Sequence, residues 1–105
     1  MLRTALILPV LLALAFPAAA QWSREQRGQF STDCTESCQE NPQVHPTRRG
    51  ECAAYCACVM GEAEKFISEA DYTRLNKLAE DGGSDPKLDR FRSLFPMCNR
   101  RIFGQ

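Results

Sequence analysis

Residues 51–60 read ECAAYCACVM, and the spacing of the three cysteines in this stretch decides the fold. At about 100° of rotation per residue, Cys52 and Cys56 lie about 40° apart on a helix, whereas Cys58 is turned about 200° from Cys56. The three side chains therefore cannot share one partner. A metal site that used both Cys56 and Cys58 would require local unwinding, because residues two apart on a helix do not face each other. The stretch predicts a helix with disulfide attachments on two sides.

The first twenty residues have the organisation of a secretory signal peptide. Arg3 supplies the positive start, an apolar run covers residues 5–14, and Ala18 and Ala20 occupy the small-residue positions before a cleavage site. The apolar run is shorter than the roughly 20 residues that a membrane span needs, and no stop-transfer charges follow it. We therefore expect cleavage after Ala20, no membrane insertion of the mature chain, and a periplasmic or secreted location.

The mature part, residues 21–105, is expected to be a single domain in which disulfides supplement a small core. Loss of Arg3 with the signal leaves 12 basic and 13 acidic side chains, a balance that does not indicate nucleic acid or an anionic membrane as a partner. Domains of this size rarely gain more than about 3–5 kcal/mol from the core alone. All six cysteines lie in this part, and an even number in an exported chain is typical of a disulfide framework.

The mature part is predicted to contain four helical segments and no strand. Residues 21–30 are polar and contain a glycine, so they are expected to be a frayed helix or to lack regular structure. Asp33 and Glu36 have the spacing of a capping box, which predicts a short helix from there to about Glu40. The following NPQVHP, with two prolines in six residues, is typical of a loop.

The second helix is predicted from about Gly50 to Ile67. Over this range apolar residues recur at steps of three and four, which is the period of one helical face. The face consists of Cys52, Cys56, Val59, Ala63 and Phe66.

A third helix is predicted to begin after Ser68. Asp71 lies at the reciprocal position of a capping box with Ser68, while Ile67 and Tyr72 lie at the positions of a hydrophobic staple. The glycines at 82–83 tolerate the left-handed conformation that ends a helix.

The fourth helix is predicted to open at Asp85, because Pro86 suits the first helical position. Pro96 lies inside the helix, so a kink or a break is expected there. The apolar stripe of this helix consists of Leu88, Phe91, Leu94, Phe95, Cys98 and Ile102. The sequence thus predicts an all-α fold, a disulfide-stapled helical hairpin with two further short helices.

The cysteine pairing follows from helix spacing. Cys34 and Cys38 are four apart, like the pair in the second helix, so two antiparallel helices can be joined by an inner and an outer bond. Six cysteines allow 15 connectivities, and helix spacing with loop direction favours one of them as a hypothesis. It joins Cys38 to Cys52, Cys34 to Cys56, and Cys58 to Cys98.

The block AYCACVMGEAEKFISEADYTRL, residues 54–75, resembles a loosely defined set of small exported bacterial proteins, mostly uncharacterised. In these proteins a Y-C-x-C motif opens a helix, earlier cysteines precede it, and a last cysteine lies near the C-terminus. Here the motif is formed by Tyr55, Cys56 and Cys58, and Cys98 is the distal cysteine. The resemblance implies a periplasmic helical protein and no known activity.

The first four cysteines are also similar in spacing to the twin C-x₃-C motif of small mitochondrial intermembrane-space chaperones. Those proteins have no cleaved export signal and no counterparts of Cys58 and Cys98. The similarity implies a stapled helical hairpin and, as a further alternative function, a small chaperone-like binder of apolar segments. A defensin-like αβ fold has a comparable cysteine order, but residues 59–67 keep a helical period.

No pattern for catalysis or for cofactor binding occurs in the sequence. His45, the single histidine, is interpreted as a solvent-exposed loop residue. There is no C-x-x-C-H haem motif, no C-x-x-C redox pair and no glycine-rich phosphate loop. We therefore expect a protein that is not an enzyme and that uses no cofactor or metal.

The first function hypothesis is an exported interaction or accessory protein with an unknown protein partner. Its predicted contact surface is an aromatic end formed by Trp22, Phe30 and Phe103. The alternative is a periplasmic thiol or Cu(I)-handling protein that uses the C-x-C pair Cys56 and Cys58, since soft thiolates favour Cu(I).

Overall fold

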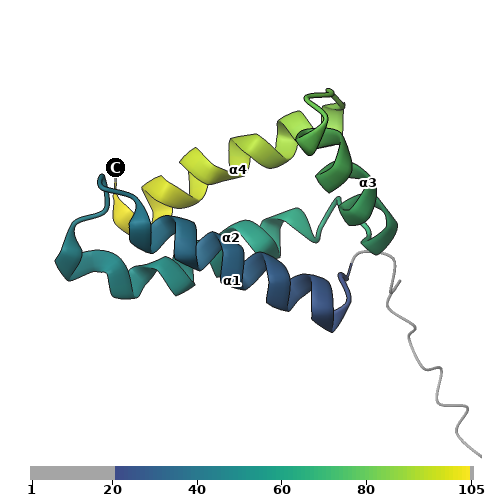
Figure 1. Ribbon diagram of the computed structural model, residues 1–105. Coiled ribbons are helices and arrows are strands. Elements are labelled where there is room, and N and C mark those ends of the chain that lie inside the picture. The colour runs from purple at the N-terminus through teal and green to yellow at the C-terminus, as the bar shows by residue number, and fades with distance from the viewer. Residues whose placement is uncertain (1–20, 105) are drawn as a thin grey trace, which may run out of the picture.

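The computed structural model describes residues 21–104, which form four α-helices and one 3₁₀-helix and contain no strand (Figure 1). The predicted signal peptide, residues 1–20, and Gln105 lie outside the described residues. The predicted all-α fold with three disulfides is confirmed. The elements are α1 (Arg24–Glu40), η2 (Pro46–Glu51), α2 (Cys52–Ala63), α3 (Glu69–Glu80) and α4 (Pro86–Phe103).

Helix α2 is central, because both α1 and α4 pack against it. At one end of the molecule α3 joins α2 to α4 (Figure 1). Phe30 of α1 contacts Phe91 of α4, and farther along both helices Cys38 and Phe103 share a cluster. Helices α1 and α4 therefore run parallel to each other, and both are antiparallel to α2.

Helix α1 begins at Arg24, so the prediction of a frayed or irregular segment at 21–30 is wrong. The helix starts with a capping box: the main-chain N–H of Gln26 donates to Ser23 Oγ at 3.1 Å, and the main-chain N–H of Ser23 donates to Gln26 Oε1 at 3.0 Å. Trp22, directly before the cap, is only 4% exposed. The capping box predicted at 33–36 is not the start of the helix, because those residues lie in its interior.

The second helix is shorter than predicted. The 3₁₀-helix η2 precedes it, with Pro46 at its first position and His45 Nδ1 accepting the main-chain N–H of Thr47 at 3.2 Å. After Ala63 the chain tightens into a turn, in which the main-chain N–H of Phe66 donates to the Ala63 carbonyl at 3.1 Å. Such i→i−3 bonds satisfy carbonyl groups at a helix end, and here they bring the chain to the start of α3.

Helix α3 begins and ends as predicted. The main-chain N–H of Asp71 donates to Ser68 Oγ at 3.1 Å, and Asp71 Oδ2 accepts the main-chain N–H of Ser68 at 3.2 Å. Beyond the last helical residue, Glu80, Gly82 adopts a φ of 73°, the left-handed region that glycine tolerates.

Helix α4 is capped by Asp85 with Pro86 at its start, as predicted, but it runs on to Phe103 without a break at Pro96. A proline removes one helical hydrogen bond and crowds the preceding turn. The residues that hold this helix to α2 lie on both sides of the proline, since Leu94 and Cys98 are buried.

The disulfide pairing in the structure is the same as the pairing that helix spacing favours, and each bond joins Cα atoms 5.7–5.9 Å apart. Two bonds join α1 to α2, and the third joins α2 to α4. Half of the bonded cysteines are nearly inaccessible, namely Cys52, Cys56 and Cys98. The disulfides therefore lie in the core, between the helices that they join.

Candidate functional site

A groove of about 610 Å³ runs between α1 and α4, with Tyr55 of α2 among its lining residues. We call it the aromatic groove, because seven of its lining residues carry aromatic rings. These are Trp22, Phe30, Tyr55, Tyr72, Phe91, Phe95 and Phe103.

The seven rings form one continuous series, in which each ring contacts the next. Neighbouring ring centroids are 4.7–6.4 Å apart, and most pairs meet edge to face, the separation and arrangement that aromatic pairs prefer. The contact between Phe30 and Phe91 crosses from α1 to α4. The series follows the order Tyr72, Trp22, Phe30, Phe91, Phe95, Tyr55 and Phe103.

The series is not fully buried. Trp22 and Phe103 belong to the core, at 4% and 8% exposure. The other five rings of the series are half-buried. Contiguous apolar surface in a concave site of about 300–1,000 Å³ is the common form of a binding pocket. The groove therefore has the size and the lining of a binding site.

The three residues of the predicted aromatic end do not lie together at one end of the molecule. Trp22 contacts Tyr72 near the start of α3, and Phe103 packs with Cys38 near the end of α1, so these two residues lie at opposite ends of the groove. Both are buried and contribute to the core; of the three predicted contact residues, only Phe30 is half-buried.

The groove contains four other half-buried rings, which the sequence did not indicate as contact residues. They are Tyr55, Tyr72, Phe91 and Phe95. A signal for their partial exposure was present in α1, whose sequence between Arg24 and Glu40 contains a single large apolar side chain, Phe30. One such side chain cannot cover the stripe of α4.

Polar groups lie along the groove beside the rings. Asp33 and Ser37 come from α1, and Asn76 comes from α3. Burial raises the pKa of the Tyr72 hydroxyl, and the negative charge of Asp33 raises it further; burial also raises the pKa of Tyr55. Both hydroxyls therefore stay protonated near neutral pH and can form hydrogen bonds with a ligand.

Arg48 closes the end of the groove at Phe103. Its guanidinium donates to the Phe103 carbonyl at 2.7 Å, to the Ile102 carbonyl at 3.2 Å and to Glu51 at 2.6 Å, and it lies 5.3 Å from the centre of the Phe103 ring. A cation at the carbonyl end of a helix is favourable. His45 is exposed at the same end, and its Nδ1 atom accepts a hydrogen bond from the main-chain N–H of Thr47 in η2.

The cysteines do not form a thiol site in this structure. Cys56 is bonded to Cys34 of α1, and Cys58 is bonded to Cys98 of α4. The two cysteines of the C-x-C pair therefore attach α2 to two different helices. Among residues 21–104 no cysteine is free, and no three His, Cys, Asp or Glu side chains gather as metal ligands would.

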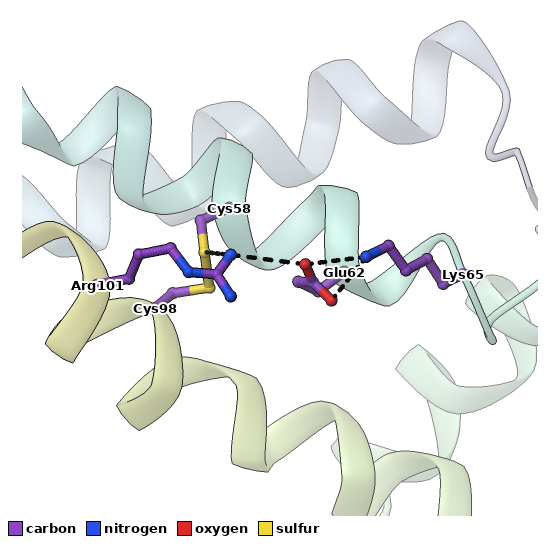
Figure 2. The surroundings of a disulfide bond; sticks show 5 residues. All are labelled: Cys58, Glu62, Lys65, Cys98 and Arg101. Atoms are coloured by element: carbon purple, nitrogen blue, oxygen red, sulfur yellow. Dashed lines mark hydrogen bonds and ion pairs between the residues drawn. A yellow bond between two sulfur atoms is a disulfide. The ribbon is translucent and has the colours of Figure 1, made fainter.

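The Cys58–Cys98 bond is partly covered by charged side chains (Figure 2). Arg101 Nη1 lies 3.5 Å from Cys58 Sγ and 3.5 Å from Glu62 Oε1, and Glu62 also pairs with Lys65 at 3.1 Å. These contacts lie outside the aromatic groove, none of whose lining residues they involve.

Within residues 21–104, no helix has both the length and the apolar character that crossing a bilayer would require. Comparison of the chain with models of protein families, with curated proteins and with solved structures gives no match.

Proposed function

We propose that this protein is an exported interaction protein, not an enzyme, and that it holds an apolar segment of a partner protein in the aromatic groove. The observation that carries the proposal is the series of half-buried rings, which leaves apolar surface exposed in a concave site. Holding an apolar segment is also what a small chaperone-like binder does, so that alternative uses the same groove.

The disulfides support the proposal because they fix the shape of the groove before a partner arrives. The bonds of Cys34 and Cys38 attach α1 to α2, and the bond of Cys98 attaches α4 to α2. Both walls are thus joined covalently to the same central helix. A preformed site loses less conformational entropy on binding than a flexible one.

The same bonds support an oxidising location. Disulfides persist in secreted and periplasmic proteins and are rare in the cytosol. Together with the signal-peptide pattern of residues 1–20, they favour export to the periplasm or beyond it.

The experiment that tests the proposal is capture of partners from a periplasmic or secreted extract with the wild-type protein and two variants. Phe95→Ala removes a half-buried ring of the groove, and Phe66→Ala removes a half-buried ring outside it, which packs under Arg90. We expect wild type and Phe66→Ala to capture the same protein and Phe95→Ala to lose it. Equal capture by both variants, or robust catalytic turnover without any partner, would contradict the proposal.

A further inference from the structure

The second half of α1 carries three carboxylates that form no ion pair described within residues 21–104. Asp33 lines the groove, whereas Glu36 and Glu40 lie outside its lining. They follow Asp33 at steps of three and four, so all three share a side of the helix. All three are exposed. This side of α1, which borders the groove at Asp33, is therefore negatively charged.

Glu40 does not stabilise the helix that carries it. A helix favours basic side chains near its C-terminal end, yet the last turn of α1 contains none. Glu40 lies in that last turn, so its charge opposes the helix dipole, and no ion pair described within residues 21–104 compensates it.

Many of the basic side chains of the domain are already engaged elsewhere. Arg27 pairs with Glu64, and Arg48 donates to Glu51 and to two carbonyls of α4. Others pair across or within helices, as Lys87 does with Asp71 and Arg101 does with Glu62. Among the residues that line the groove, Asp33 is thus the charged side chain still available to a ligand.

The shape of the groove favours a helix as the occupant. Helices α1 and α4 have 17 and 18 residues, about 25 Å at about 1.5 Å per residue, and they run parallel on either side of the groove. An amphipathic helix can lay its apolar face into such a groove. From Asp33 to Glu40 the carboxylates extend over about 10 Å of helix, a spacing that basic side chains three, four and seven apart on a neighbouring helix can match.

We propose that the occupant of the aromatic groove is a basic amphipathic helix of the partner protein. This inference rests on the proposed function and names its ligand. The apolar face of the helix contacts Phe30, Phe91 and Phe95, and its Lys or Arg side chains pair with Asp33, Glu36 and Glu40. An isolated single-chain lipid supplies the apolar contact but not a row of positive charges.

The test uses two synthetic 18-residue peptides with the same Leu pattern, one with Lys and one with Glu at the polar positions, and neither with tryptophan. Trp22 is the single tryptophan of the chain and lines the groove, so its fluorescence reports binding. We expect the Lys peptide to bind at least about tenfold more tightly than the Glu peptide in low salt, with a smaller difference at about 1 M salt, where charges are screened within about 3 Å.

Two triple variants locate the charge effect. The variant that combines Asp33→Asn, Glu36→Gln and Glu40→Gln is expected to bind the Lys peptide at least about fivefold more weakly than the wild type. This corresponds to a loss of about 1–2 kcal/mol of binding free energy. The matched control removes three exposed carboxylates that do not line the groove; they line a neighbouring hollow, which shares Tyr72 and Asn76 with it. It combines Glu25→Gln, Glu69→Gln and Glu80→Gln, and we expect it to leave the affinity unchanged.

The outcomes separate this inference from the proposed function. Equal binding of both peptides, lost in Phe95→Ala but unaffected by the groove triple variant, would overturn the basic helix and leave the apolar site standing. A Trp22 response to lysophosphatidylcholine below its micellar concentration, with no response to either peptide, would identify a lipid site and overturn both. If both triple variants weaken binding of the Lys peptide equally, the effect comes from the net charge of the domain, and the inference is overturned.

Discussion

The indole N–H of Trp22 donates a hydrogen bond to the main-chain carbonyl of Ile67 at 3.0 Å. The two residues are 45 positions apart in the sequence, and both are buried, at 4% and 3% exposure. The bond joins the start of α1 to the turn between α2 and α3. It also fixes one end of the aromatic groove, because Trp22 and Ile67 both line it.

Replacement of Trp22 by Phe is expected to destabilise the domain by about 1–3 kcal/mol, because the Ile67 carbonyl would stay buried without a donor. The measurement is urea unfolding of the oxidised protein followed by circular dichroism. Phe66→Leu, a change of a half-buried ring outside the groove, is the control and should cost less. An unchanged unfolding midpoint in Trp22→Phe would show that the hydrogen bond does not hold α1 in place.

Arg27 and Glu64 form an ion pair, with Arg27 Nε 2.8 Å from Glu64 Oε1. Glu64 is buried whereas Arg27 is half-exposed, so removal of the arginine leaves a carboxylate in a poorly hydrated site. We expect Arg27→Met to cost about 1–3 kcal/mol, and Glu64→Gln in that background to restore part of the loss. Arg24→Met, at an exposed position on the same helix, serves as the control. Equal stability of the two arginine variants would contradict the prediction.

We expect Asp71 to make the domain sensitive to acid. Lys87 donates to its carboxylate at 2.6 Å, the main-chain N–H of Ser68 donates to it at 3.2 Å, and these bonds hold its pKa far below the usual range. A lowered pKa in the folded state contributes stability that is present above the unfolded value of about 4 and is lost as the pH falls below it.

Between pH 5 and about pH 2 we therefore expect Asp71→Asn to lose less stability than the wild type. Thermal unfolding over this range is the measurement. Asp81→Asn, at an exposed cap position of the same helix, should follow the wild-type curve. If Asp71→Asn shows the same acid slope as the wild type, the capping box and its lysine do not produce the sensitivity.

Local spacing predicted much of the fold correctly. The capping boxes and caps at Ser68 and Asp85 depend on residues three or fewer positions apart, and the cysteine spacing on two helices is also a local property. The start of α1 was missed although Ser23 and Gln26 have the S-x-x-Q spacing of a capping box. What the sequence did not show is the burial of Trp22 beside this cap, which depends on the distant Ile67. A polar segment gives no sign of such a contact.

The groove could not be predicted because it depends on how three helices are placed. Phe91 and Phe95 belong to an apolar stripe, and a stripe indicates burial without showing what covers it. In the structure α1 and α4 both pack on α2, and α1 offers only Phe30 as a large apolar side chain against that stripe. The exposure of the rings is therefore a property of the assembled fold.

The exported form is expected to begin at Gln21 and to carry no free thiol. Ala18 and Ala20 fit the cleavage rule, and all six cysteines are paired. Intact mass spectrometry with an alkylating reagent, before and after reduction, measures both properties. A secreted species that retains residues 1–20 would contradict the cleavage prediction, and alkylation before reduction would support the thiol or Cu(I) alternative.

The Cys58–Cys98 bond is the disulfide that holds α4, whereas the other two join α1 to α2. It closes a loop with a sequence separation of 40, for which the chain-entropy relation gives about 4 kcal/mol. We expect joint replacement of both cysteines by Ala to lower the melting temperature by more than about 10 °C, since about 1 kcal/mol corresponds to about 4–8 °C in a domain of this size. Thermal unfolding of the oxidised variants is the measurement.

Replacement of Cys38 and Cys52 is the matched comparison, because that bond closes a shorter loop, with a sequence separation of 14, worth about 3 kcal/mol in the same relation. It should lower the melting temperature less and leave the α4 wall attached. The variant that lacks Cys58 and Cys98 should still bind the partner at temperatures below its melting temperature, because α4 keeps its contacts with α2. Its binding should be weaker than that of the wild type, because α4 has lost its covalent attachment. If this variant loses binding while its melting temperature is unchanged, the cysteines act through their chemistry, and the structural role assigned to the bond is wrong.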